Sequence, residues 1–213
     1  MDKFEKYYEF LISENEKYNL TAITEKEEVY IKHFKDSINA SLALDFNNVA
    51  TLCDIGSGAG FPGIPLKITF PHLKLTIIEP TLKRCKFLEN LVLQLDLKDV
   101  IIINDRAENI NKLRNSFDVV VARAVSQLPI LLELCIPYVK VDGFFVALKG
   151  SNYQDEIASS KNALKELSSS IEDIITYELE NNNGVHSLIK IKKNDKTKSI
   201  YPRHYSKIKS KPL

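Results

Sequence analysis

Apolar side chains recur at every third or fourth position in the first part of the chain, which is the period of an amphipathic helix. Residues 3–18 and 25–44 follow this pattern, with Phe4, Tyr7 and Leu11 on the apolar face of the first segment. The sequence Asn19-Leu-Thr21 separates the two segments. We therefore predict two helices, and we assign residues 1–48 to an N-terminal helical segment packed on the rest of the protein.

From about residue 50, short apolar runs alternate with helical segments. The predicted strands are 51–55, 74–79, 100–103, 117–122 and 143–148, and the predicted helices are 62–70, 81–95, 127–138 and 152–168. The strands are almost continuously apolar, as in Val100-Ile-Ile-Ile103, which is typical of strands buried on both faces of a parallel sheet. This alternation predicts a doubly wound, Rossmann-like α/β sheet.

The pattern changes again after residue 170. Two strand-like runs, 171–180 and 185–193, follow each other across the turn Asn181-Asn-Asn-Gly184, which predicts an antiparallel hairpin. By analogy, five parallel strands that end in a hairpin are the order of a class I methyltransferase. We therefore assign residues 49–213 to one such domain.

Glycines are concentrated at one point of the chain. The sequence has seven, and four of them, Gly56, Gly58, Gly60 and Gly63, follow the first predicted strand and open the first helix of the domain. Glycine permits positive φ angles and a close approach of a ligand to the backbone. The carboxyl edge of a parallel sheet is also where such folds bind cofactors. The segment is therefore a candidate cofactor loop.

Two residues of this loop indicate which cofactor it binds. The glycine spacing from Gly58 to Gly63 formally matches G-x-G-x-x-G, the signature of a dinucleotide. However, the carboxylate of Asp54 would lie close to a pyrophosphate, and Pro62 removes a backbone N–H that a phosphate uses at a helix start. S-adenosylmethionine (AdoMet) has no phosphate and carries an ammonium and a sulfonium, which a carboxylate favours. We therefore predict AdoMet.

Other polar residues follow the strands at the same edge. Glu79, at the end of the second strand, is expected to accept hydrogen bonds from both ribose hydroxyls. The loop 104–108, which ends in Ala107-Glu108, is suited to flank an adenine. Phe61 packs either on the cofactor or in the core. Arg123 follows the fourth strand, where it either acts at the point of methyl transfer or forms a structural ion pair.

Charge and cysteine usage indicate the kind of partner and the cellular compartment. The 213-residue chain has a net charge of +1, but Lys190–Leu213 contains nine Lys or Arg and one Asp. This basic tail indicates a polyanionic partner, with a solubilising tail as the alternative. The three scattered cysteines and the lack of metal-ligand spacing indicate reduced core thiols and no metal. With no long apolar run, we expect a cytoplasmic monomer that does not enter a membrane.

Several of these motifs together resemble one family. They are Asn19-Leu-Thr21, His33-Phe-Lys-Asp36-Ser37, Asp54-Ile-Gly-Ser-Gly-Ala-Gly-Phe-Pro-Gly-Ile-Pro-Leu66, Arg106-Ala-Glu108, Arg123-Ala124 and Tyr201-Pro-Arg203. The chain is similar to the RsmG (GidB) family, the bacterial 16S ribosomal RNA guanine-N7 methyltransferases. The family's tail usually continues after Tyr-Pro-Arg with a Lys-Pro-Gly type sequence, whereas this chain has His204-Tyr-Ser206.

The resemblance implies AdoMet binding through Gly56, Phe61, Ala107-Glu108 and Arg123. It also implies a target guanine in the 530 loop of 16S rRNA, either as free rRNA or in the 30S subunit. From the resemblance and the charge pattern, we take four residues as candidate RNA contacts: Asn19, His33, Lys149 and Arg203.

The absence of some motifs agrees with this chemistry. Methylation of an exocyclic amine commonly uses an Asn/Asp-Pro-Pro-Tyr/Phe box, and the chain has no Pro-Pro; none of its cysteines follows a proline, as a cytosine-C5 nucleophile usually does. Guanine N7 is unprotonated at neutral pH and needs no general base, so catalysis can rest on alignment. The alternatives are a small-molecule or protein methyltransferase, an NAD-dependent oxidoreductase, and a non-catalytic AdoMet-binding ribosome-assembly factor.

Overall fold

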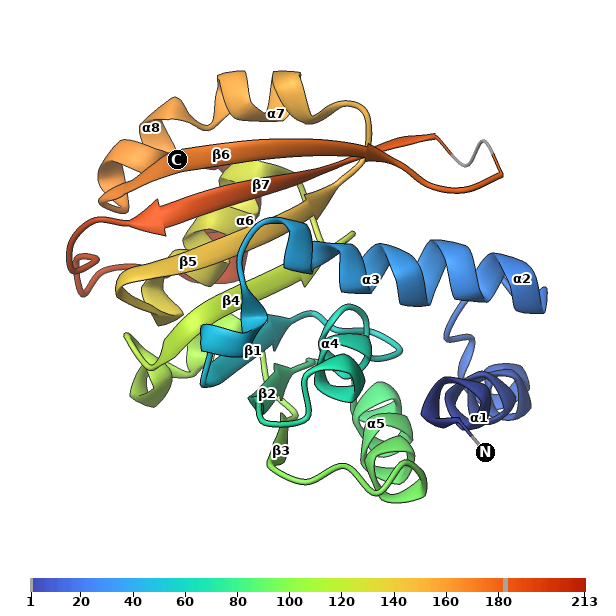
Figure 1. The fold of residues 1–213 in the computed structure, drawn as a ribbon. Helices are drawn as coiled ribbons and strands as arrows, with labels where there is room; N and C mark the ends of the chain where they lie inside the picture. The colour runs from blue at the N-terminus through green and yellow to red at the C-terminus, as the bar shows by residue number, and fades with distance from the viewer. Residues whose placement is uncertain (1, 182–183) are drawn as a thin grey trace.

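A seven-stranded sheet forms the centre of the computed structural model, which describes residues 2–181 and 184–213 (Figure 1). The strand order is β3-β2-β1-β4-β5-β7-β6. The strands are β1 (Thr51–Ile55), β2 (Lys74–Ile78), β3 (Val100–Ile103), β4 (Phe117–Arg123), β5 (Val139–Lys149), β6 (Ser169–Glu178) and β7 (Val185–Lys193). Strands β1–β5 are parallel, and β7 runs antiparallel to β5 and β6. The predicted doubly wound sheet with a C-terminal hairpin is confirmed.

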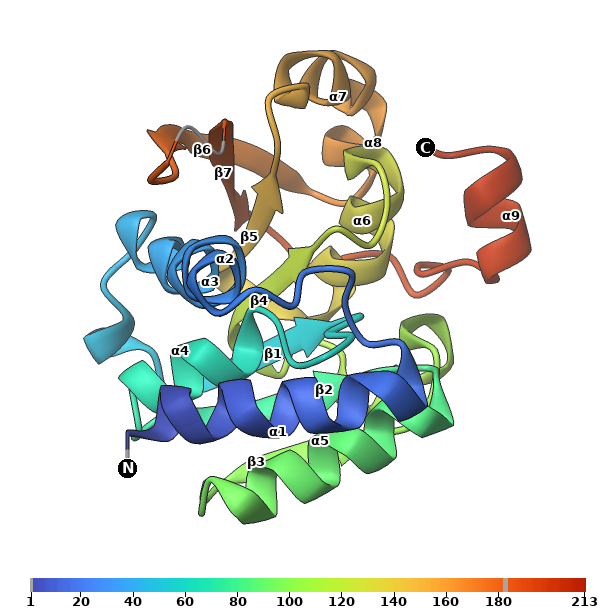
Figure 2. The same cartoon turned by 90° about the vertical axis from the view of Figure 1, so that its right-hand side faces the viewer.

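Both faces of the sheet are covered, which explains the continuous apolar runs. Successive residues of a strand point to opposite faces, so Leu52 belongs to one buried cluster and Cys53 to the other. The first cluster lies under α1 (Lys3–Tyr18), α4 (Gly63–Thr69) and α5 (Leu82–Gln94). The second lies under α6 (Leu128–Cys135) and α8 (Lys161–Glu166). These helices occupy the two sides of the sheet in Figure 2.

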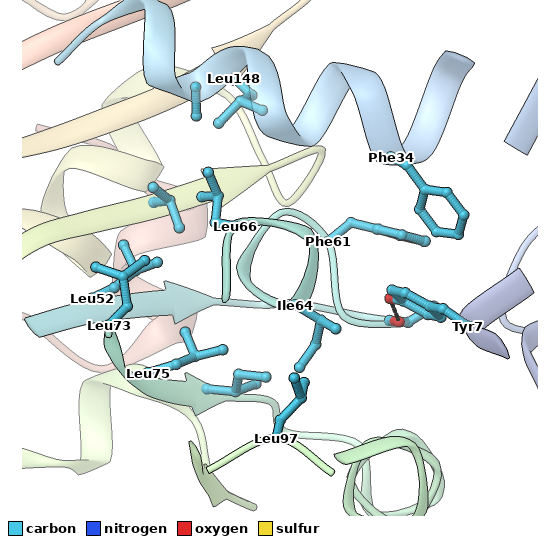
Figure 3. Packing of buried hydrophobic residues seen from close by; sticks show 14 of the residues in the cluster. Tyr7, Phe34, Leu52, Phe61, Ile64, Leu66, Leu73, Leu75, Leu97 and Leu148 are labelled. Atoms are coloured by element: carbon cyan, nitrogen blue, oxygen red, sulfur yellow. Dashed lines mark hydrogen bonds between the residues drawn. The ribbon is translucent and has the colours of Figure 1, made fainter. Parts of the chain in front are cut away.

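The N-terminal helices belong to the first of these layers. Tyr7 of α1 is fully buried, and its hydroxyl donates to the carbonyl of Ala59 in the glycine loop at 2.5 Å (Figure 3). Phe34 of the second helical stretch packs on the rings of Tyr7 and Phe61. The N-terminal segment therefore shares one core with the sheet, and its aromatic side chains pack against the glycine loop.

The second helical stretch is less regular than the predicted helix 25–44. It consists of α2 (Lys26–Val29), a π-helical segment (Tyr30–Lys35), α3 (Asp36–Ile38) and a 3-10 turn (Asn39–Leu42). The carbonyl oxygens of Lys32 and His33 in the π-helical segment accept hydrogen bonds from Arg123 of β4. A hydrophobic period cannot indicate such a change of helix type, because it is coupled to a residue distant in the sequence.

Three other features differ from the prediction: the start of one strand, the continuity of one helix and the presence of a further helix. Strand β5 begins at Val139 rather than 143, with Asp142 at a φ of +66°. The predicted helix 152–168 is divided into α7 (Tyr153–Ser159) and α8 at Ser160, whose hydroxyl donates to the carbonyl of Glu156. A short helix that the sequence reading did not predict, α9 (Tyr205–Ser210), follows β7.

The predicted turn 181–184 includes residues 182 and 183, which lie outside the described residues. Among the residues that the structure describes, no helix combines the length and the apolar character needed to cross a membrane.

Candidate functional site

The glycine loop joins β1 to α4 at the carboxyl edge of the sheet. Gly56, Gly58 and Gly60 have φ angles of +73°, +61° and +106°, which L-residues rarely adopt. A Cβ on Gly60 would lie 2.5 Å from the Tyr7 hydroxyl, and one on Gly63 would lie 2.7 Å from Asp54 Oδ2. Internal packing therefore requires glycine at these two positions. Gly58 differs, because a Cβ there would meet no atom within 4 Å, so its outer side is free for a ligand.

Asp54 lies beneath the loop rather than on its surface. Its side chain is fully buried, and Oδ2 accepts from the Ser57 hydroxyl at 2.6 Å and from the Gly63 N–H at 2.8 Å. Oδ1 is buried without a hydrogen-bond partner. Burial raises the pKa of Asp54 to about 6, against the opposing hydrogen bonds from Ser57 and Gly63. Asp54 therefore fixes the start of α4 and places a weakly satisfied carboxyl group under the loop.

Glu79 also contacts the loop backbone. Its Oε2 accepts from the Gly58 N–H at 3.0 Å, and its Oε1 accepts from the Thr81 N–H at 2.9 Å. The side chain is 1% exposed. The structure thus brings Glu79 to the predicted position beside Gly58, where it ties the end of β2 to the loop; its bond to a ribose stays a prediction.

A small cavity of about 110 Å³ opens between the ends of β1, β2 and β4. It is lined by Ile55, Gly56, Ile78, Pro80, Arg106, Ala107, Glu108, Val125, Leu134 and Tyr205. Glu108 Oε1 is buried there without a hydrogen-bond partner. The structure therefore brings Gly56, Ala107 and Glu108 together, as predicted, around a space with one unsatisfied acceptor.

A large cavity of about 500 Å³ lies on the other side of the segment after β4. Its lining residues are Ile23, Lys32, His33, Asp36, Arg123, Ala124, Leu148, Lys149, Gly150, Glu156 and His186. Consecutive residues, Ala124 and Val125, line the large and the small cavity respectively. The segment after β4 therefore contributes one residue to each cavity.

Arg123 is at the centre of the polar network of the large cavity. Its Nη1 donates to Asp36 Oδ2 at 2.9 Å and to the Lys32 carbonyl at 3.0 Å, and its Nη2 lies 3.3 Å from His33 Nδ1. The guanidinium carbon is 4.8 Å from the centre of the Phe61 ring. The structural ion pair that the sequence left open is therefore present, within a cavity wall.

Phe61 takes the core position of its two predicted alternatives. Its ring is 6% exposed and lies parallel to the rings of Tyr7 and His33, with centroids 5.5 and 4.6 Å apart. Because Phe61 contacts both His33 and Arg123, it joins the glycine loop to the wall of the large cavity. A direct contact between its ring and the cofactor stays a prediction.

His33 is held as a neutral acceptor toward Arg123. Because the arginine can only donate, His33 Nδ1 must accept, and the proton is on Nε2, which lies 2.8 Å from Thr21 Oγ1. Burial, and then the charge of Arg123, lowers the pKa of His33 to about 4. Both ring nitrogens are therefore engaged, and the ring is uncharged at neutral pH.

We expect the His33 imidazole to titrate with a midpoint near 4 in an NMR pH titration of its Hε1 resonance. Arg123→Met should move this midpoint upward, because the charge that, after burial, contributes most to the lowered pKa is removed. A midpoint near the ordinary value of 6.5 in the wild-type protein would contradict the assigned tautomer and network.

Three residues of this network were missed by sequence reasoning. Tyr177 of β6 donates to Asp36 Oδ1 at 2.6 Å, and His186 Nδ1 of β7 lies 2.9 Å from the same oxygen. Thr21 holds His33 and belongs to the quoted Asn19-Leu-Thr21 motif. The motif was a usable signal for Thr21, but nothing in the sequence places the hairpin residues beside Asp36.

The structure brings only two of the four candidate RNA contacts to the large cavity. His33 and Lys149 line the large cavity, and Lys149 pairs with Glu156 at 2.6 Å. Asn19 is the exposed left-handed residue that ends α1, and Arg203 pairs with the fully buried Glu133 at 2.6 Å. The backbone and ion-pair contacts account for Asn19 and Arg203 structurally; RNA contact stays a prediction for all four.

The basic tail is partly neutralised within the protein. Lys190, Lys192 and Lys198 form ion pairs with acidic side chains, and Lys193 is fully buried. Burial lowers the pKa of Lys193 to about 8, and its Nζ donates to Asn115 and to the Val139 carbonyl. The predicted polyanion contact must therefore rely on fewer charges than the count of nine suggests.

AdoMet suits the donor and acceptor groups around the small cavity. Glu108 Oε1 accepts no hydrogen bond, although Arg106 Nη1 lies 3.9 Å away, and it is an acceptor for an amino group. Asp54 Oδ1, also without a hydrogen bond, gives the loop a negative character that a cation favours. Within the described ranges 2–181 and 184–213, no group of three or more His, Cys, Asp or Glu is arranged to hold a metal ion.

Comparison with solved structures shows the fold. The chain matches the structure of "M. jannaschii TYW2 in complex with AdoMet" with a TM-score of 0.60 and 18% identity over 76% of each chain. It matches "the Mitomycin 7-O-methyltransferase MmcR" with a TM-score of 0.61 and 16% identity, over 75% of this chain and 53% of that one. The class I methyltransferase fold is therefore shown.

Comparison with known sequences shows the family. A protein of Bacillus cytotoxicus named ribosomal RNA small subunit methyltransferase G is 50% identical over 206 residues, which are 95% of this chain and 86% of that protein. A protein of the same name from Bacillus cereus is 48% identical with the same coverage. The model of the GidB family, described as rRNA small subunit methyltransferase G, matches residues 1–183. The chain therefore belongs to the GidB family of rRNA small subunit methyltransferases.

Proposed function

We propose that this protein transfers a methyl group from AdoMet to N7 of a guanine in the 530 loop of 16S rRNA, with the small cavity for the adenosine end of the cofactor and the large cavity for the guanine. The observation that supports this most strongly is that consecutive residues after β4, Ala124 and Val125, line the large and the small cavity respectively. The names of the relatives support ribosomal RNA as the substrate.

The loop and its neighbours would hold the cofactor. Gly58 offers close approach to the backbone, Gly56 lines the small cavity, and Gly60 keeps the loop against Tyr7, with Asp54 beneath them. Glu79 is expected to bind the ribose and Glu108 to accept from the adenine amino group. AdoMet would supply an electrophilic methyl group on its sulfonium. The lone pair of guanine N7 would form the new N–CH3 bond as the S–CH3 bond breaks, with S-adenosylhomocysteine as the leaving product and no loss of a proton.

The reaction needs no general base, and the large cavity holds Arg123 in place through hydrogen bonds with Asp36 and His33. His33 has both ring nitrogens engaged, so it orients neighbours rather than accepts a proton. A guanidinium has five N–H donors, so Arg123 retains a donor on Nη2 or Nε for O6 of the guanine after its bonds to Asp36 and His33. Residues of this cavity thus orient the base, and alignment supplies the catalysis.

The RNA around the guanine would meet the candidate contacts Asn19, His33, Lys149 and Arg203, and we expect its binding to weaken with salt. A ribosomal substrate would place the enzyme in the cytoplasm, where we expect it to act as a monomer.

The direct test is transfer of labelled methyl from AdoMet to 30S subunits and to free 16S rRNA that lack the modification, followed by base-specific cleavage. Label at N7 of a guanine in the 530 loop is expected. Label in protein or small molecules would refute the substrate assignment. AdoMet binding without any transfer would indicate a non-catalytic assembly factor.

We expect Arg123→Met to lower the transfer rate by about 100-fold, the order of loss that a misplaced reactant causes, with little change in AdoMet affinity. Arg123→Lys should recover only part of the rate, because lysine lacks the planar fork. The measurements are single-turnover rates and calorimetric AdoMet binding for both variants. A parallel loss of AdoMet affinity would mean that Arg123 holds the cofactor carboxylate instead.

A further inference from the structure

The C-terminal segment returns to the cofactor side of the sheet. Helix α9 (Tyr205–Ser210) comes after β7, in the part of the chain beyond residue 183, where the match to the family model ends. It packs against α6, with Ile208 fully buried in the second cluster, and Figure 2 shows it on that side of the molecule. The helix is therefore part of the folded domain rather than a loose basic extension.

A buried ion pair fixes the start of α9. Arg203 donates from Nε and Nη2 to the two carboxylate oxygens of Glu133, at 2.8 and 2.6 Å, and its backbone N–H donates to the same group at 2.8 Å. Glu133 is fully buried in α6. Because a carboxylate held by two guanidinium N–H groups is fixed in direction as well as distance, the position of Tyr205, two residues later, is closely defined.

Tyr205 reaches the small cavity. Its half-buried side chain lines the cavity together with Arg106, and the Arg106 guanidinium carbon is 5.0 Å from the centre of the tyrosine ring. Gly56 and Ile78 line the same cavity from the sheet. A guanidinium at this distance from an aromatic face is attracted to it. Two flat groups therefore form the solvent side of the cavity.

The size of the cavity indicates what fits. Its volume of about 110 Å³ is well below the roughly 300–1,000 Å³ of sites that enclose whole small molecules. It suits one ring system, and Glu108 Oε1, which accepts no hydrogen bond and lies 3.9 Å from Arg106 Nη1, is an acceptor for an amino group on that ring. Adenine combines a planar ring with such an amino group.

We propose that Tyr205, steadied by Arg106, is the outer wall of the adenine pocket, so that helix α9 is part of the cofactor site. This inference rests on the proposed function, because it assumes AdoMet as the ligand. Tyr205 contributes its aromatic face, since base–aromatic stacking needs no hydroxyl. The ligand class is adenine nucleosides, and Tyr205 acts in their affinity rather than in the transfer step.

The test measures equilibrium binding of AdoMet and of 5′-methylthioadenosine, which shares its adenosine part. Tyr205→Ala should weaken both by a similar factor, roughly 10- to 100-fold, whereas Tyr205→Phe should bind both as the wild type does. Lys209→Ala, on the exposed part of the same helix, is the matched control. Because the chain has no tryptophan, Tyr205→Trp introduces a single tryptophan, whose fluorescence both ligands should quench.

Thermal melts separate folding from binding. The inference is overturned if Tyr205→Ala has the melting temperature of the wild type and binds each ligand as tightly as the wild type does. It is also overturned if Tyr205→Phe loses as much affinity as Tyr205→Ala. Failure of the wild-type protein to bind AdoMet would instead overturn the proposed function. Quenching of the Tyr205→Trp variant by methionine alone would also count against an adenine contact.

Discussion

Gly58→Val is expected to abolish AdoMet binding while the protein stays folded, whereas Gly60→Val is expected to unfold it. A side chain at Gly58 would enter open space on the ligand side of the loop, at a φ of +61°, with a strain of about 1–3 kcal/mol. At Gly60, the φ of +106° and contacts of 2.5 and 2.9 Å with Tyr7 and Ile64 add overpacking to the strain. The total at Gly60 is about 4 kcal/mol or more.

Urea unfolding and AdoMet titration of both variants measure the two effects separately. Gly58→Ala provides a graded control, because it introduces the same backbone strain with a smaller side chain in the ligand space. Normal AdoMet affinity in Gly58→Val would show that the open side of Gly58 does not face the cofactor. A Gly60→Val protein as stable as the wild type would contradict the packing of the loop on α1.

The sheet was predictable because each buried strand has a local signature. The apolar runs at 51–55 and 100–103 coincide with β1 and β3, and the run at 185–193 coincides with β7. Features that depend on distant partners were not predictable. The π-helical segment at Tyr30–Lys35 bonds to Arg123, and helix α9 depends on the pairing of Arg203 with Glu133 across the chain.

The site was predictable in its composition but only partly in its geometry. The positions of Gly56, Ala107 and Glu108 around one cavity follow from strand ends that meet at one sheet edge. Asp54 and Gly60 both face the protein interior, because Asp54 bonds to Gly63 and Gly60 packs on Tyr7; a cofactor contact stays a prediction for both. Sequence spacing locates a carboxylate beside a loop, but not the direction in which it points.

Asp54 has a measurable effect on stability that follows from its burial. Its pKa is raised from 3.8 to about 6 in the folded protein, so the folded state binds the proton more tightly than the unfolded state. The stability that this group contributes is therefore fully present below pH 3.8 and is lost as the pH rises through about 6. A shift of this size corresponds to about 3 kcal/mol.

Asp54→Asn should consequently be more stable than the wild type at pH 8, by up to about 3 kcal/mol, and nearly equal to it at pH 4. The amide oxygen can still accept from the Gly63 N–H, so the loop keeps this bond. Urea unfolding of both proteins at the two pH values is the measurement. A destabilised Asp54→Asn variant at pH 8 would show that the carboxylate is better stabilised in the fold than its burial indicates.

The same carboxylate should make AdoMet binding depend on pH in the opposite direction. The positive groups of AdoMet favour the ionised form of Asp54, so the cofactor lowers its pKa and binds more tightly as the proton leaves. Wild-type affinity should thus rise by up to about tenfold per pH unit as the pH approaches 6, and level off above it. Asp54→Asn should bind AdoMet more weakly at pH 8 and lack this rise.

Calorimetric titrations between pH 4.5 and pH 8 give the affinity of both proteins as a function of pH. Parallel curves for the two proteins would assign the pH dependence to another group. A variant that gains stability and loses cofactor affinity would show that the loop keeps a buried carboxylate for binding, at the expense of folding.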